Sequence, residues 1–121
     1  MATYPQYLLD HYKNPRNCGM IRNPDFRAKE NNIFCGDFVE ISGTVKNKKI
    51  ADIKFSGRGC VVSQAAASLI TEFVKGKSLT RIERISIDDI IKLLGVTLSP
   101  TRKKCGELPL IALKKGLGIT K

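Results

Sequence analysis

The chain of 121 residues has no tryptophan, its aromatic residues make up only 7%, and His11 is its one histidine. The scarcity of aromatic side chains weighs against a protein that stacks nucleic-acid bases. No apolar run approaches the ~20 residues that a membrane-spanning helix needs. The first residues also lack the basic-then-apolar pattern of a secretory signal. We therefore expect a cytoplasmic protein with no membrane partner, folded as one domain over residues 1–121.

Acidic residues are also scarce, since 21 lysines and arginines stand against 11 aspartates and glutamates, a formal net charge of +10. A basic surface favours acidic partners and is a candidate footprint for nucleic acid. The cations are spread along the chain in short groups at 46–49, 102–104 and 114–115, and no nucleic-acid-binding motif accompanies them. The sequence favours a solvated surface that meets an acidic protein. A basic nucleic-acid-binding domain with a structural zinc is the alternative, and it predicts affinity that falls steeply with salt.

The hydrophobic pattern predicts an α+β fold. Near-alternating β-branched and aromatic residues predict strands over 38–45 and 50–55, joined by a turn at 46–49. A stable sheet needs a third strand, which we expect after Asn23. Helical spacing predicts helices over 4–12, 61–75, 79–84, 87–94 and 106–117, with a loop over 96–104 and Pro109 in the first turn of the last helix. Because strands come early and helices late, we expect a small antiparallel three-stranded sheet with helices packed on one face.

Four cysteines are the main chemical signal. They could form two disulfides, but cytosolic thiols stay reduced and become candidates for metal or sulfur chemistry. Cys35 and Asp37 point to the same side of an extended segment. Cys60 is expected at the start of a helix, whose positive end favours a thiolate, and Cys105 just before the last helix beside three cations. Such a set could hold zinc or an iron–sulfur cluster, whereas the alternative is a group of small buried hydrophobes.

Several motifs occur in order: residues 10–17 (Asp-His-Tyr-Lys-Asn-Pro-Arg-Asn), Cys35-Gly36-Asp37, Gly57-Arg58-Gly59-Cys60 with its Ser/Ala-rich helix, residues 75–79 (Lys-Gly-Lys-Ser-Leu) and Lys104-Cys105. Together they resemble the U-type iron–sulfur cluster assembly scaffold family over nearly the whole chain. The resemblance implies a protein that receives sulfur from a cysteine desulfurase, assembles a transient [2Fe-2S] cluster and transfers it to recipient apoproteins. It implies a carrier and not an enzyme, with Zn²⁺ as an alternative occupant of the same site.

Carried over by position, the resemblance implies that the cluster or metal ligands are Cys35, Asp37, Cys60 and Cys105. Cys105 and Cys35 are then the candidate persulfide acceptors. The oxygen ligand Asp37 would suit zinc and would keep a cluster labile, because cluster iron prefers thiolate. Neither Cys18 nor His11 is expected to be a ligand.

The chain departs from the family's housekeeping branch at two places. Lys104 stands where that branch has a histidine, as in the SufU-type branch of zinc-bound sulfur acceptors, but the insertion typical of that branch is missing. A zinc-dependent sulfurtransferase therefore stands as the alternative to a cluster scaffold. Residues 98–102 also do not match the chaperone-recognition motif Leu-Pro-Pro-Val-Lys, so an Hsp70-type chaperone partner is doubtful.

Overall fold

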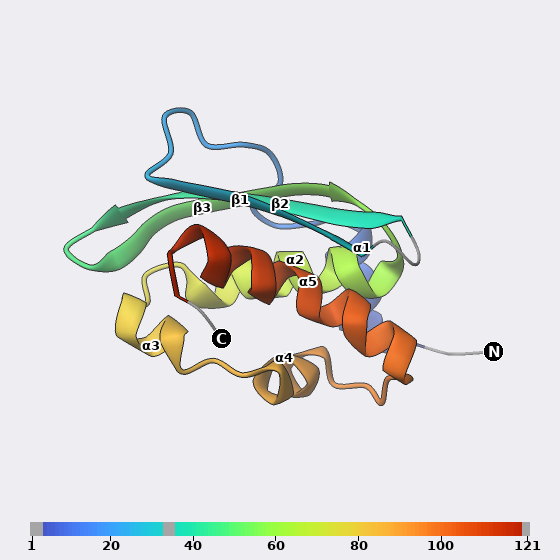
Figure 1. Ribbon diagram of the computed structural model, residues 1–121. Coiled ribbons are helices and arrows are strands. Elements are labelled where there is room, and N and C mark those ends of the chain that lie inside the picture. The colour runs from blue at the N-terminus through green and yellow to red at the C-terminus, as the bar shows by residue number, and fades with distance from the viewer. Residues whose placement is uncertain (1–3, 33–35, 120–121) are drawn as a thin grey trace.

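Residues 4–32 and 36–119 are described by the computed structural model of the chain, in which three strands form one antiparallel sheet (Figure 1). The strands are β1 Phe26–Asn32, β2 Asp37–Lys46 and β3 Lys49–Arg58, in the spatial order β1-β2-β3. Asn32 pairs with Asp37 at one end of the first ladder, and Phe38 pairs with Arg58 at the same end of the second. The register therefore brings the start of β2 beside the end of β3.

The helices are α1 Gln6–Lys13, α2 Val61–Val74, α3 Leu79–Glu83, α4 Ile87–Leu94 and α5 Pro100–Gly116. Figure 1 shows α2 and α5 against one face of the sheet, with α3 and α4 beyond them. The segment between α1 and β1 crosses the opposite face, where the Ile21 amide donates to Ser42 Oγ. The predicted α+β fold, with an antiparallel three-stranded sheet and helices on one face, is confirmed.

A single apolar core lies between the sheet and the helix pair α2 and α5. Alternate residues of β2 and β3 point into it, because successive side chains of a strand face opposite sides. Helical spacing along α2 and α5 supplies the other half. Fully buried members of this core include Val39, Ile41, Ile53, Phe55, Val62, Ala66, Ile70, Leu110 and Leu113. Each large side chain of this kind stabilises the fold by about 1.5–3 kcal/mol relative to full exposure.

The prediction of a loop over 96–104 is wrong, because α5 begins at Pro100. Ser99 caps the helix by accepting a hydrogen bond from the Arg102 amide, and proline is well suited to the first helical position because its missing N–H has no partner there anyway. Pro109 accordingly lies inside the helix and not in its first turn. Because it lacks an N–H, Pro109 cannot donate to the carbonyl of Cys105 four residues earlier.

No helix in the described parts of the chain combines the length and the apolar character that crossing a membrane requires.

Candidate metal centre

Three chain segments meet at the end of the sheet where β3 leads into α2. Asp37 is the first residue of β2, Cys60 precedes α2, and Cys105 lies in α5. One carboxylate oxygen and the two sulfur atoms all lie within 4.8 Å of one another. Among the residues that the structure describes, this is the one cluster of three or more histidine, cysteine or acidic side chains close enough to hold a metal ion. Sequence positions far apart thus form one compact donor set.

Asp37 is held by the sheet and by the backbone at Gly36. The Gly36 amide donates to the Asn32 carbonyl at 2.9 Å, and Gly36 has φ +71°, a conformation that glycine adopts without steric cost. Asp37 is only 5% exposed, and its Oδ2 accepts from the Cys60 amide at 3.4 Å. A buried carboxylate is costly unless charges or donors compensate it. The site therefore favours a cation beside Asp37.

Gly59 makes room for this carboxylate. A Cβ atom built on Gly59 would lie 2.6 Å from Asp37 Cγ and 2.5 Å from Ser63 Oγ, distances that real Cβ atoms do not show. Any larger residue would displace the Asp37 carboxyl group, Ser63 or both from their present positions. The glycine before Cys60 is thus needed for the close approach of Asp37 and α2.

Cys60 lies at the N-cap of α2, as the sequence predicted, and is half-buried. Its sulfur is 4.0 Å from Ser63 Oγ in the first turn of that helix. Arg102 of α5 also contacts it: a hydrogen bond with Cys60, and then the negative charge of that sulfur, raise the pKa of Arg102 above its ordinary value. The partial positive charge of a helix N-terminus and a guanidinium therefore both face Cys60.

Cys105 does not precede the last helix as predicted. It lies in the second turn of α5 and is 1% exposed, because the helix begins five residues earlier at Pro100. The positive end of the helix, which was expected to act on Cys105, is therefore at Ser99. Its electrostatic effect decays within the first turn and does not reach Cys105. Instead, the Asn32 side-chain amide donates to Cys105 Sγ at 3.9 Å, within the range for a sulfur acceptor. The sulfur is fixed between α5 and β1.

The donor set fits zinc. Zinc binds sulfur at about 2.3 Å and carboxylate oxygen at about 2.0–2.2 Å, so the donor atoms of a tetrahedral site lie about 3.3–3.8 Å apart. The observed limit of 4.8 Å lies about 1 Å above that range, a difference that side-chain rotation can close. Three protein donors leave one tetrahedral position. The fourth predicted ligand, Cys35, lies outside the described residues, although both neighbouring segments end at this site.

The remaining candidates lie elsewhere or at the rim. Cys18 is exposed and forms an isolated bridge with Phe55, and the His11 Nδ1 is 2.8 Å from Ser68 Oγ in a buried contact of α1 with α2. Lys104 is exposed and lines a hollow of about 290 Å³ beside Asn32. Neither Cys18 nor His11 was expected to be a ligand, and the structure places neither in the cluster.

Sequence reasoning missed two contacts of the site, that of Asn32 with Cys105 and that of Arg102 with Cys60. The only signal for Arg102 was its spacing, because residues 102 and 105 share a helix face once 100–105 is known to be helical. Nothing in the sequence distinguished Asn32 from its asparagine neighbour.

Comparison with known proteins gives one consistent family. The family model described as the NifU-like N terminal domain matches residues 3–119. The zinc-dependent sulfurtransferase SufU of Bacillus subtilis is 37% identical, with 94% of this chain and 88% of the relative covered. The iron–sulfur cluster assembly scaffold protein IscU 1 of Archaeoglobus fulgidus is 35% identical, with 94% and 74% covered.

A solved structure has the same fold. It is that of FiSufU, a SUF-system protein of Fervidobacterium islandicum AW-1, which superposes with a TM-score of 0.78 at 28% identity, covering 94% of this chain and 96% of that one. The alignment with the Bacillus relative extends over 131 positions, more than the 121 residues here, so that relative carries residues that this chain lacks.

Proposed function

The chain belongs to the NifU-like N-terminal domain family, and from that premise we propose that it is an iron–sulfur cluster assembly scaffold. It receives sulfur from a cysteine desulfurase, assembles a [2Fe-2S] cluster as its cargo and transfers that cluster to recipient apoproteins. The observation that carries the proposal is the convergence of Asp37, Cys60 and Cys105, whose donor atoms lie within 4.8 Å of one another. Cys35 is proposed as the remaining ligand.

The donor set suits a cargo that must leave again. Thiolates bind cluster iron strongly, whereas a carboxylate oxygen is a poorer partner for it. Asp37 is also engaged by the Cys60 amide, so its oxygen has an alternative partner when the cargo departs. We therefore propose Asp37 as the ligand that keeps the cluster transferable.

Burial bears on which thiol first accepts sulfur. In the transfer, a scaffold thiolate attacks the outer sulfur of the desulfurase persulfide, a new S–S bond forms, the old one breaks, and the desulfurase cysteine leaves as a thiolate. No net oxidant is needed. Cys105 is 1% exposed, so it could attack an external persulfide only after α5 or β1 had moved. Of the two candidates, Cys35 and Cys105, we propose Cys35 as the first acceptor.

The second candidate function is a zinc-dependent sulfurtransferase. The 37% identity with the Bacillus sulfurtransferase and the presence of Lys104 at the rim of the site favour it. The residues that this chain lacks relative to that protein favour the scaffold. In the sulfurtransferase, Zn²⁺ would be held by the same four residues, Cys35, Asp37, Cys60 and Cys105, and it would supply Lewis-acid stabilisation of thiolates.

The remaining proposals follow from this function. Residues 1–121 act as one domain, supported by the one sheet and the one core that the described residues form. The protein is a carrier without turnover of a small substrate. Its reduced thiols suit a cytoplasmic setting. Its partners are a cysteine desulfurase and recipient apoproteins, and no Hsp70-type chaperone is proposed.

The test is reconstitution under anaerobic conditions with a cysteine desulfurase, cysteine and ferrous iron, followed by visible spectroscopy and by iron, sulfide and zinc analysis. We expect the absorption of a [2Fe-2S] cluster, which Cys60→Ser abolishes and Cys18→Ser, at an exposed cysteine outside the site, leaves unchanged. A colourless protein that keeps one zinc and only accelerates the desulfurase would establish the sulfurtransferase instead. A protein that binds neither metal nor cluster would overturn both.

Replacing Asp37 tests the account of transfer. With Asp37→Ala, we expect a cluster that still assembles but passes to an apo-ferredoxin at least about tenfold more slowly, a change of about 1.4 kcal/mol in the barrier. The measurement is the transfer rate followed by circular dichroism. Transfer at the unmutated rate would show that the oxygen ligand does not control release.

A further inference from the structure

Five exposed or half-exposed lysines cluster at the end of the β2–β3 hairpin, here called the lysine tip. Lys46, Lys48 and Lys49 come from the hairpin turn, and Lys75 and Lys77 come from the connection between α2 and α3. The metal centre uses none of these residues.

Backbone hydrogen bonds hold the two segments of the tip together. The Ile50 amide donates to the Lys77 carbonyl at 3.0 Å, the Gly76 amide donates to the Ile50 carbonyl at 2.8 Å, and the Leu79 amide donates to the Lys48 carbonyl at 2.9 Å. The five charges therefore sit on one rigid unit and are presented together. The backbone of this surface therefore needs little ordering when a partner binds, and the ordering cost falls on the lysine side chains alone.

Lys48 occupies a position that its side chain does not favour. Asn47 and Lys48 form a two-residue turn with φ +54° and +60°, and the second position of such turns strongly prefers glycine. Lys48 is exposed, so its side chain adds nothing to the core. Backbone geometry therefore does not explain this lysine, whereas a requirement for positive charge does.

Acidic neighbours offset only part of this charge. Asp52 is paired with Lys75 at 3.4 Å, and Asp25 accepts from the Val45 amide near the base of the turn. The nearby ring of Phe73 is covered by cations, with Lys77 Nζ 5.2 Å from its centroid and Arg81 on the same ring. That ring is not available to stack a base, which disfavours single-stranded nucleic acid. The chemistry favours carboxylates on a protein surface.

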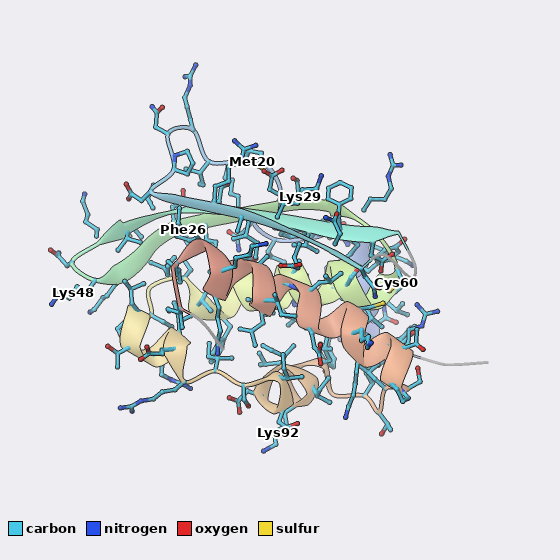
Figure 2. All side chains as sticks on the ribbon, in the orientation of Figure 1. Met20, Phe26, Lys29, Lys48, Cys60 and Lys92 are labelled. Atoms are coloured by element: carbon cyan, nitrogen blue, oxygen red, sulfur yellow. The ribbon has the colours of Figure 1, made fainter. Side chains whose placement is uncertain are left out.

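The tip lies at the opposite end of the sheet from the metal centre. Figure 2 shows Lys48 and Cys60 at opposite ends of the sheet. The ten residues of β3 connect these ends, a span of about 30 Å at about 3.3 Å per residue. A protein bound at the tip would therefore leave the metal centre open to a second partner.

We propose that the lysine tip docks an acidic protein surface while the metal centre at the other end faces the sulfur donor. This inference rests on the proposed scaffold function, because it assigns the second of two simultaneous partners. The tip partner is a protein that presents clustered carboxylates, and it holds the scaffold without covering its cysteines.

The test uses the full chain labelled with ¹⁵N and titrated with poly-L-glutamate, a defined polyanion that carries only carboxylates. We expect amide shifts confined to residues 46–50 and 75–79 at 0.1 M salt, and their loss at 1 M, where the Debye length is about 3 Å. The variant Lys46→Gln, Lys48→Gly, Lys49→Gln should bind poly-L-glutamate about tenfold more weakly. Each exposed ion pair contributes only a small part of the binding free energy, and the loss of three such pairs adds up to about this factor.

A matched variant controls for net charge. Lys13→Gln, Arg22→Gln, Lys92→Gln also removes three exposed cations, but none from the tip. It should bind poly-L-glutamate within about twofold of the unmodified chain. Equal weakening by both variants, or shifts that centre on residues 58–63 and 100–108, would overturn the proposal. Tighter binding of a 20-base-pair DNA duplex than of poly-L-glutamate at equal salt would overturn it in favour of nucleic acid.

Cluster assembly separates this proposal from the one on which it rests. The tip variant should assemble a cluster at the unmodified rate, because its replaced residues lie outside the site. Lost assembly in the unmodified chain with intact tip binding would count against the scaffold function alone. Intact assembly with no tip binding would count against the docking surface alone.

Discussion

Adding one methyl group at Gly59 should weaken metal binding. In Gly59→Ala, the new Cβ would lie 2.6 Å from Asp37 Cγ and 2.9 Å from Asp37 Oδ2. Nonbonded carbon atoms prefer about 3.5–4.0 Å, so the carboxyl group must move by about 1 Å. Metal ligands tolerate only about 0.2 Å, and disturbing the positioning of a ligand typically costs 10–100-fold in affinity. We expect zinc affinity to fall by that factor, or about 1.4–2.7 kcal/mol.

The measurement is a competitive titration of the reduced protein with zinc and a chromophoric chelator, without oxygen. Gly106→Ala is the matched control, because its Cβ would meet Leu94 Cδ1 at 3.3 Å and not Asp37. That variant should bind zinc within about twofold of the unmodified chain. Circular dichroism shows whether both variants are folded. A folded Gly59→Ala protein with unmodified zinc affinity would refute the assignment of Asp37 as a ligand held in place by this glycine.

Two further predictions concern residues outside the site. Burial lowers the pKa of His11 below its ordinary 6.5. Below about pH 6.5 the unfolded chain therefore binds more protons than the folded chain, and the free energy of unfolding should fall as pH drops from 7 to 5.5. Urea titrations should show a smaller pH dependence in His11→Gln, and an unchanged pH dependence would assign it to other groups. Lys114 is 9% exposed and donates to the carbonyls of Glu83 and Ile85 at 3.3 and 2.5 Å; Lys114→Met should lose about 1–3 kcal/mol in urea unfolding, whereas unmodified stability would show that water replaces these bonds.

The strands show where sequence patterns suffice. The hairpin was predictable because β2 and β3 bury one face and alternate accordingly, as with Val39, Ile41 and Ile53. The first strand has almost no such pattern: only Phe26 and Asn32 at its two ends are buried. The strand can remain polar because its inward positions 28 and 30 are only partly covered. It could therefore be expected only from the need for a third strand, and its bounds came from tertiary pairing.

The start of α5 shows where a breaker residue misleads. Pro100 suggested a loop, and residues 101–104 are polar enough to agree with one. Ser99 followed by proline is equally the signature of a helix start, and the structure uses it as such. The second proline, Pro109, then seemed to fix the helix start near 106. Packing of α5 against β1 and α2 compensates the hydrogen bond that Pro109 cannot make, and no local pattern encodes that packing.

The cysteine site was likewise only partly predictable from the sequence. Local geometry placed Cys60 at a helix N-terminus, and that prediction is confirmed. The prediction that Cys35 and Asp37 point to the same side of an extended segment stays a prediction, because Cys35 lies outside the described residues. The proximity of Cys105 could not follow from spacing, because it depends on how α5 lies across the sheet. The family resemblance supplied that information. Arg102 came within reach of Cys60 only through the helical turn that sequence reasoning had assigned to a loop.

The unequal burial of the three donors gives the site a direction. Asp37 and Cys105 are 5% and 1% exposed, so the sheet and α5 close the inner side. Cys60 is half-buried, and the exposed Gly36 lies beside the segment that carries Cys35. We therefore expect iron, sulfur or a recipient thiolate to approach past Cys60 and Gly36. Arg102 is exposed and contacts Cys60 on this side, and its charge favours an incoming thiolate over a neutral thiol.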